Sequence, residues 1–420
     1  MEKLVIEGGY PLEGEVPISG SKNAALPIMA ATLLAADGCR LDNVPRLRDI
    51  RTMCSLIEEL GADLKYTNGT VEVDTSQLNQ NEAPYELVKK MRASVLVLGP
   101  LVARLGEARV SLPGGCAIGS RPINLHLEGL EALGADIDLH QGTVHAQASR
   151  LRGAVITLDF PSVGATENIL MAAALAEGET VIENAAREPE IADLARAVNK
   201  MGGHVEGAGT DKILVEGVEE LHGLKHSILP DRIETGTYLT AGAISVGEIK
   251  AVKTNPGLLQ SVLKKLRQSG MKVNEGEDWI DLKANFPPEP VDIVTMPYPG
   301  FPTDMQAQFT AMLARASGTS TVKETIFEDR FMHVLELERL GADIKIDGNW
   351  VTIHGVEKLE GAPVMATDLR ASAALVLAGL AAEGTTEVRR IYHLDRGYEK
   401  LEKKLENLGA KLERQEAEGP

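Results

Sequence analysis

A cysteine in a glycine-rich run has the residue types that small-molecule chemistry needs. Residues 112–122 read LPGGCAIGSRP, so Cys116 has small neighbours and Arg121 follows five positions later. Glycine allows close backbone approach to a ligand and adopts many conformations. A thiol in an electropositive, accessible segment can act as an acid or as a nucleophile, depending on its protonation state. The pattern predicts an active-site lid over a small ligand, whereas a merely packed turn cysteine is the less favoured interpretation.

Composition and charge limit the class of protein. A chain of 420 residues predicts two domains, and 44% hydrophobic residues with only 4% aromatics predict cores of Leu, Val, Ile and Ala. The formal net charge of −18 argues against nucleic acid or an anionic membrane as the main partner. A local group of arginines can still bind a small anion.

The sequence favours a cytoplasmic enzyme. The first residues, MEKLVIE, lack a signal-peptide pattern, and no apolar run reaches membrane-spanning length. Cys39, Cys54 and Cys116 form no disulfide framework, which is typical of a reducing compartment. Of these three, Cys39 and Cys54 lie in a predicted strand and an amphipathic helix, where a thiol is usually an inert core residue.

A helix that ends in glycine and leads into a strand recurs six times, about 70 residues apart. Each copy has apolar residues at helical spacing, and its glycine is expected to supply a left-handed C-cap. Between the copies lies a second element, an Ala/Leu-rich helix followed by glycine and a strand, as in residues 31–41, 172–182 and 375–388. The pattern predicts an α/β protein of six repeated units. The glycines of the first element are Gly61, Gly134, Gly202, Gly270, Gly341 and Gly409.

The two ends of the chain complement one another. Five of the six copies continue into a partner strand, but the last, ending near residue 414, runs out of chain before one appears. Residues 3–14 match the missing partner in pattern, so we expect the N-terminal strand to complete the C-terminal repeat. This predicts one domain of residues 22–229, which carries the cysteine loop, and another of 1–21 plus 230–420. Two chain crossings make a hinge, and a hinge indicates a cleft that closes on substrate.

Eight short motifs, in order along the chain, carry a resemblance to a known family. The chain resembles the enolpyruvyl transferases, and among them the UDP-N-acetylglucosamine 1-carboxyvinyltransferases, over its full length. The resemblance implies two inside-out α/β barrel domains of three repeated units each, pseudo-sixfold overall, with a cleft between them. The motifs are SGSKNA (19–24), the 114–122 loop, PSVGAT (161–166), LPDRIETG (229–236), FPTDMQAQ (301–308), DRF (329–331), DLRAS (368–372) and DRGY (395–398).

The family reaction moves the enolpyruvyl group of phosphoenolpyruvate to the 3′-hydroxyl of UDP-N-acetylglucosamine by addition and elimination, releasing phosphate. Such a reaction needs an acid for C3, a base for the hydroxyl and positive charge for two anionic groups. The resemblance implies that Cys116 is the acid and Asp304 the base, with Lys22 and Arg396 as further catalytic residues. From the residues alone, Asp304 could equally be an ordinary helix N-cap.

The resemblance also implies which residues bind the substrates. Lys22, Arg121 and Arg396 match contacts to phosphoenolpyruvate, and Arg92, Arg330 and Arg370 are further matched arginines. The uridine turn corresponds to Pro122, Ile123, Asn124 and Leu125, the diphosphate loop to Ser162, Val163 and Gly164, and sugar-side contacts to Asn23 and Ile326. We expect small-molecule substrates, no metal, no cofactor, and no nucleic-acid or membrane partner. The sequence predicts no particular oligomeric state.

Two departures from the family pattern affect nucleotide binding. Many relatives have Asp where this chain has Asn124, and some have Lys where it has Phe160. Two alternatives compete with the main interpretation. The sister family that acts on shikimate 3-phosphate shares the fold, but lacks the Pro-Gly-Gly-Cys loop. A catalytically silent, nucleotide-sugar-binding paralogue would not need Lys22, Cys116 and Asp304 together.

We predict that Cys116 is the one thiol modified by fosfomycin, an epoxide mimic of phosphoenolpyruvate, because Cys39 and Cys54 have core settings. Mass spectrometry after incubation should find a single adduct, located by peptide mapping at Cys116. Cys116→Asp keeps an acid but removes the target, so this variant should be active and resistant. An adduct on Cys39 or Cys54 would contradict the assignment.

Overall fold

The computed structural model describes residues 2–112 and 123–416. These residues form two compact units, and the chain passes between them after Ser19 and after Leu229. The first unit contains residues 2–19 and 230–416, and the second contains residues 20–112 and 123–229. In the described part of the chain, no helix is both long and apolar enough to cross a membrane.

Each unit is built from three four-stranded sheets of the same order. In five of the six, a central strand has a parallel neighbour on one side and an antiparallel hairpin on the other. In the second unit the sheets are β14 (Lys225–Ser227), β3 (Gly38–Asp42), β5 (Thr70–Asp74) and β4 (Asp63–Thr67); β6 (Glu82–Ala83), β7 (Glu107–Ser111), β9 (Thr143–Gln147) and β8 (Asp136–His140); β10 (Val155–Thr157), β11 (Glu179–Glu183), β13 (Lys212–Glu216) and β12 (His204–Glu206).

The first unit repeats this order and adds a short pair of strands, β22 (Leu359–Glu360) and β24 (Ala382–Glu383). Its sheets are β2 (Glu13–Pro17), β15 (Glu248–Val252), β17 (Trp279–Lys283) and β16 (Lys272–Glu275); β18 (Ile293–Val294), β19 (Thr319–Lys323), β21 (Trp350–His354) and β20 (Asp343–Asp347); β23 (Pro363–Met365), β25 (Thr385–Arg389), β1 (Glu2–Glu7) and β26 (Lys411–Glu416).

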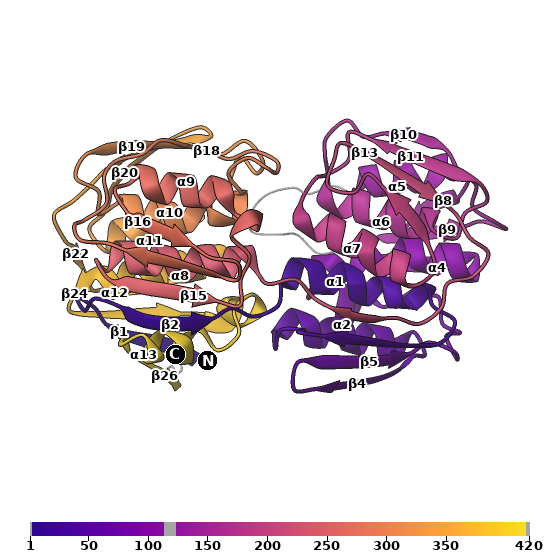
Figure 1. Cartoon of the computed structure of the whole chain (residues 1–420), viewed down its shortest axis with the longest axis horizontal. Helices are drawn as coiled ribbons and strands as arrows, with labels where there is room; N and C mark the ends of the chain where they lie inside the picture. Colours follow the sequence, from indigo (N-terminus) through magenta and orange to yellow (C-terminus); the bar gives the residue numbers. More distant parts are fainter. Residues whose placement is uncertain (1, 113–122, 417–420) are drawn as a thin grey trace. The chain divides into compact units, whose positions relative to one another are not determined.

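In the sixth sheet, β1 takes the place that a hairpin strand has in the other five. It pairs antiparallel with both β25 and β26, so that Val5 lies opposite Glu387 on one side and Glu413 on the other. Figure 1 shows the indigo β1 beside the yellow C-terminal strand. Leu4 and Ile6 point into the core of this unit and are fully buried. The two ends of the chain therefore share one sheet.

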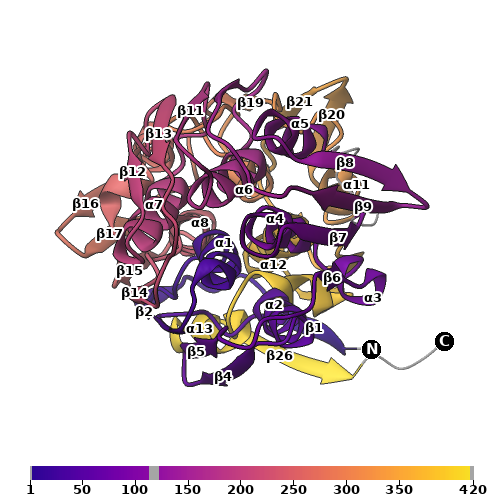
Figure 2. The same ribbon diagram turned by 90° about the vertical axis from the view of Figure 1, so that its right-hand side faces the viewer.

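Three helices lie inside each unit and the sheets lie outside them. The central helices are α1 (Lys22–Ala31), α4 (Leu98–Leu105) and α6 (Val163–Ala173) in one unit, and α8 (Arg232–Ile244), α10 (Gln306–Leu313) and α12 (Leu369–Ala381) in the other. Every residue of α8 is buried, and α8, α10 and α12 contact one another. Figure 2 shows α1, α4 and α6 surrounded by the hairpins of their unit. The resemblance implied two inside-out α/β barrels. The described residues show the α/β architecture with helices inside and sheets outside, but the sheets are separate and form no closed barrel.

A second set of helices packs between the sheets. These are α2 (Arg48–Glu59), α3 (Tyr85–Val88), α5 (Asn124–Ala132), α7 (Pro189–Lys200), α9 (Gln260–Gln268), α11 (Met332–Arg339) and α13 (Leu401–Asn407), with short 3₁₀ turns η1 (Thr32–Leu34), η2 (Arg92–Val97), η3 (Pro256–Leu258), η4 (Thr303–Met305) and η5 (Ile391–Arg396). The six repeat glycines all have φ between +84° and +99°. Their predicted role as left-handed C-caps is confirmed, because other residues rarely adopt this conformation.

The N-terminal strand should be essential for the stability of the unit it completes. Ile6→Ala removes a fully buried side chain from the core, so we expect a loss of about 2–5 kcal/mol in the free energy of unfolding. Thermal or denaturant unfolding measures it. Glu7→Ala, an exposed change on the same strand, is the control and should unfold like the parent. Equal unfolding of the two variants would contradict a core position for β1.

Candidate active site

In each unit, several of the predicted site residues lie at the first turns of the central helices. Lys22 is the first residue of α1, residues 162–164 begin α6, Asp304 lies in η4 just before α10, and Arg370 is the second residue of α12. The first amide groups of a helix have no partner within the helix, and the helix dipole places positive potential there. Each unit therefore presents several helix ends that suit an anionic ligand.

Asp304 lies between two arginines of the same unit. Its Oδ1 accepts a hydrogen bond from Nη1 of Arg330 and its Oδ2 accepts one from Nη2 of Arg370, both at 3.0 Å. The side chains of Arg330 and Arg370 are 6% and 2% exposed, whereas that of Asp304 is 25% exposed. The carboxylate of Asp304 is therefore partly accessible to solvent, whereas the two arginines that it bonds are buried.

This pairing sets the protonation of Asp304. Burial alone raises the pKa of the carboxyl group, but the charges of Arg370 and Arg330 outweigh that effect and hold the pKa well below its ordinary value. Asp304 is thus a stable carboxylate and a weak base while both arginines remain on it. An anionic ligand that drew either arginine away would make it a stronger base.

Arg370 keeps unused donor capacity. Its Nε and Nη1 are buried and have no hydrogen-bond acceptor among the described residues. Burial disfavours its charge, but Asp304 raises the pKa of the guanidinium overall. The ring of Tyr398 lies 5.4 Å from its Cζ. A buried cation with free N–H groups is a suitable partner for a phosphate or carboxylate oxygen.

The loop that carries Arg396 is held from both sides. Arg414, on β26, forms a two-pronged contact with the neighbouring Asp395, at 2.6 and 3.0 Å. On the other side, the hydroxyl of Tyr398 lies 2.9 Å from Thr237 Oγ1 and accepts from Gln308 Nε2 at 3.2 Å. The half-buried Arg396 is therefore presented by a rigid segment that packs against α12.

Lys22 has a defined acidic partner in the second unit. Its Nζ lies 2.7 Å from Oδ2 of Asp49, in the first turn of α2, and Asp49 is only 3% exposed. Ser21 caps α1 by accepting a hydrogen bond from Ala24 N. The Ser21 cap fixes where α1 begins, and the ion pair with Asp49 fixes the position of the Lys22 ammonium group. Asn23 is the next residue of the helix.

The predicted diphosphate loop rests on a buried histidine. Ser162 caps α6 through Ala165 N, and a side chain at Gly164 would lie 3.0 Å from the ring of His126. His126 bonds with Asn168, whose Oδ1 accepts from Gly99 N at 2.7 Å. Burial, with a smaller contribution from Arg92, lowers the pKa of His126 to about 3. A neutral imidazole therefore lies under the helix end, and Arg92 lies near enough to affect it.

The remaining predicted residues divide into described and undescribed ones. Ile123 is buried, Leu125 is half-buried, and Asn124 is exposed, its amide donating to Glu128 in its own helix. Ile326 is half-buried, with its N–H donated to Glu324 at 2.8 Å. Cys116, Arg121 and Pro122 lie outside the described residues, as does the whole of the predicted 114–122 loop.

The other two cysteines are unreactive by their surroundings. Cys39 and Cys54 are buried and form no disulfide. Burial raises the pKa of the Cys39 thiol to about 11 and that of Cys54 to about 12. Neither side chain is a thiolate near neutral pH, which agrees with their predicted role in the core.

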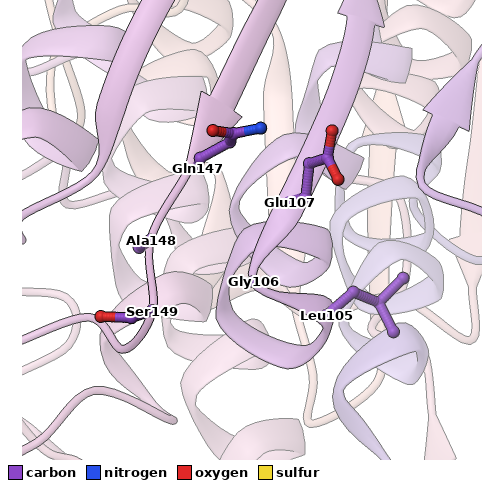
Figure 3. A pocket seen from close by; sticks show the side chains of 6 residues that line it. All are labelled: Leu105, Gly106, Glu107, Gln147, Ala148 and Ser149. Carbon is purple, nitrogen blue, oxygen red and sulfur yellow. The ribbon is translucent and has the colours of Figure 1, made fainter.

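A surface hollow elsewhere in the second unit contains no predicted site residue. It lies where α4 ends and β7 begins, across from the end of β9, and Figure 3 shows its side chains. Its mixture of one acid, one amide and small residues offers no concentrated charge. The lining residues are Leu105, Gly106, Glu107, Gln147, Ala148 and Ser149.

Several residues that complete the site were not predicted from the sequence. Asp49, His126, Thr303 and Glu324 each contact a predicted residue or its loop. One available signal was a run of polar residues inside a helix rich in apolar residues, as at Thr166 to Asn168 in α6, where all residues from 165 onward are buried. Buried polar groups need partners, so such positions indicate a hydrogen-bond network.

The fold and these helix-end charges define an enzyme class that comparison with known proteins identifies. The family model of EPSP synthase (3-phosphoshikimate 1-carboxyvinyltransferase) matches residues 6–405. The chain belongs to this family of enolpyruvyl transferases.

Individual relatives give a finer comparison. The chain is 58% identical, over 99% of both chains, to UDP-N-acetylglucosamine 1-carboxyvinyltransferase of Halorhodospira halophila. It is similar to the crystal structure of the enolpyruvyl transferase NikO from Streptomyces tendae, with a TM-score of 0.90, 28% identity and 99% of each chain covered. EPSP synthase from Acinetobacter baumannii shares the fold at a TM-score of 0.77, 18% identity, and 99% and 100% coverage.

Removing the charge of Asp304 should destabilise the ligand-free protein. Asp304→Asn leaves the guanidiniums of Arg330 and Arg370 buried beside a neutral group, which costs on the order of 3 kcal/mol. The pKa of Asp304 is depressed in the folded protein. The stability difference between parent and variant should therefore be largest above the ordinary aspartate pKa of about 4, and it should shrink as the pH falls below that value.

Thermal melting of parent and variant across pH measures this effect. Glu248→Gln is the matched control, because it neutralises one partner of an exposed ion pair with Lys283, and such pairs contribute little. A melting difference for Asp304→Asn that does not depend on pH would mean that the arginines are not held by its charge.

Proposed function

We propose that the protein transfers the enolpyruvyl group of phosphoenolpyruvate to the 3′-hydroxyl of UDP-N-acetylglucosamine and releases phosphate. The observation that carries this proposal is the open carboxylate of Asp304 between two buried arginines, in a chain 58% identical to a UDP-N-acetylglucosamine 1-carboxyvinyltransferase. The site thus combines a base for a hydroxyl with cations for the phosphate and carboxylate of phosphoenolpyruvate.

The reaction divides into addition and elimination. In the addition, the hydroxyl oxygen bonds to C2, its proton passes to Asp304, and C3 receives a proton from an acid, for which Cys116 is proposed. The product is a tetrahedral intermediate that carries both the phosphate and the sugar. In the elimination, the C2–O bond to phosphate breaks and a proton leaves C3. No P–O bond breaks.

The same arginines control the base. Phosphoenolpyruvate brings a phosphate and a carboxylate that compete with Asp304 for Arg330 and Arg370, and Arg370 already has two unused donors. As Arg370 turns to the ligand while Arg330 stays on the carboxylate, the pKa of Asp304 rises towards its ordinary value. The carboxylate then becomes a better proton acceptor when the anionic substrate is in place.

The remaining roles belong to the same proposal. Lys22, Arg121 and Arg396 contact phosphoenolpyruvate, and Arg92, Asn23 and Ile326 lie on the sugar-nucleotide side. Ser162 to Gly164 bind the diphosphate at the end of α6, where the helix dipole favours it. Ile123 to Leu125, with Pro122, hold the uridine. The reaction belongs to peptidoglycan precursor synthesis in the cytoplasm.

The alternative acceptor is shikimate 3-phosphate, the substrate of the EPSP synthases that give the matching family its name. The 58% identical relative over the whole chain supports the nucleotide sugar instead. A third possibility, a silent binding paralogue, is opposed by the intact Asp304 cluster.

Phosphate release with each acceptor offered separately tests the proposal. We expect turnover with UDP-N-acetylglucosamine and none with shikimate 3-phosphate. Asp304→Asn should lower the chemical rate ~10²–10⁴-fold, whereas its affinity for the nucleotide sugar should change far less. That affinity is measured by titration at a temperature below the melting transition of the variant. Turnover of Asp304→Asn within a few-fold of the parent would place the base elsewhere, and turnover with shikimate 3-phosphate alone would reverse the choice of acceptor.

A further inference from the structure

A second buried carboxylate, that of Glu324, is connected to Asp304 through two other side chains and has no chemical role in the reaction described above. Glu324, directly after β19, has no exposed surface. Its Oε1 accepts hydrogen bonds from Thr295 Oγ1 at 2.7 Å and from the N–H groups of Ile326 and Phe327 at 2.8 and 3.1 Å. Its Oε2 accepts from Thr303 Oγ1 at 2.9 Å. Four donors therefore converge on one carboxylate.

Thr303 connects this carboxylate to the base. A hydroxyl has one proton to donate, and that of Thr303 goes to Glu324. Its oxygen is thus left to accept from Nη1 of Arg330 at 2.9 Å, and the same Nη1 donates to Asp304 Oδ1 at 3.0 Å. A continuous chain of hydrogen bonds runs from Glu324 through Thr303 and Arg330 to Asp304.

The direction of every bond in this chain is fixed by its charged groups. The carboxylate of Glu324 only accepts and the guanidinium of Arg330 only donates, so Thr303 must donate to the first and accept from the second. A glutamine amide has one acceptor oxygen and one NH₂ donor group. If the NH₂ faced Thr303, the threonine proton would lose its acceptor; if it faced the other way, it would oppose the N–H groups of Ile326 and Phe327. Either orientation disturbs the contacts that hold Arg330. Glu324 also anchors the N–H groups of the segment that leads to Arg330.

We propose that Glu324 and Thr303 are positioning residues that fix Arg330, and through it the carboxylate of Asp304, for proton transfer from the acceptor hydroxyl. This inference rests on the proposed function of Asp304 as the base. Displacement of a catalytic group by about 1 Å can cost on the order of 100-fold in rate, so such residues affect turnover without touching substrate.

Three near-isosteric variants test the chain. Thr303→Val and Glu324→Gln should each lower kcat by ~10-fold or more, while KM for the acceptor changes less. Thr303→Ser keeps the hydroxyl and should stay within a few-fold of the parent. Both residues act through Arg330, so their effects should not add. The kcat of the double variant Thr303→Val/Glu324→Gln should lie within about twofold of that of the slower single variant.

Thr240→Val is the matched control. Thr240 has a fully buried hydroxyl in the same unit that donates to Gly236 O within α8, so its loss measures what a missing buried hydroxyl does by itself. We expect parental kcat. Thermal melting and nucleotide-sugar binding verify that each variant is folded. If Glu324→Gln does not fold, the comparison of kcat between Thr303→Val and Thr303→Ser tests the positioning role.

Parental kcat in Thr303→Val, equal losses in its Ser and Val variants, or additive losses in the double variant would overturn the inference. An inactive parent enzyme would instead refute the proposed function. An active parent with a slow Asp304→Asn and an unaffected Thr303→Val would refute the positioning role alone.

Discussion

The structure depends on helices that are buried along their whole length. A central helix such as α8 has no exposed side, so apolar and small side chains must cover it all round, and only its ends can carry chemistry. Close packing accompanies this burial: a side chain at Gly99 would lie 2.4 Å from Asn168 on the neighbouring helix. Polar residues are thus driven to the first turns, where N–H groups lack partners and a charged side chain or ligand is stabilised.

The same constraint explains how an acidic protein can offer an anion site. The net charge is −18, but charge separated by more than about 10 Å is screened at moderate salt. Around Asp304, by contrast, Arg330 from the segment before α11 and Arg370 from the first turn of α12 are nearly excluded from water and have one carboxylate between them. Low local polarity strengthens their attraction for a second anion. Local burial, rather than overall charge, determines what this site attracts.

Two carboxylates in the first unit show how burial and partners assign different chemistry to the same group. Asp304 is paired with guanidiniums and partly open, so a ligand can change its environment. Glu324 is fully enclosed by hydroxyl and amide donors and has no access to ligand. Adjustable surroundings suit the base proposed at Asp304, whereas constant ones suit the positioning role proposed for Glu324. The hydrogen bonds of Thr303 and Arg330 join the two.

The sequence by itself determined the local elements. Periodicity and glycine placement predicted the six capped helices, and the left-handed φ of all six glycines confirms them, because backbone preference is a property of a few neighbouring residues. Its motifs were enough to identify the family. Only the tertiary structure decided which charges meet: Asp304 bonds to arginines 26 and 66 positions away. It also decided that Thr303 lies on Glu324, 21 positions along the chain. Such contacts depend on how whole helices and sheets pack, and no local pattern in this chain encodes those distances.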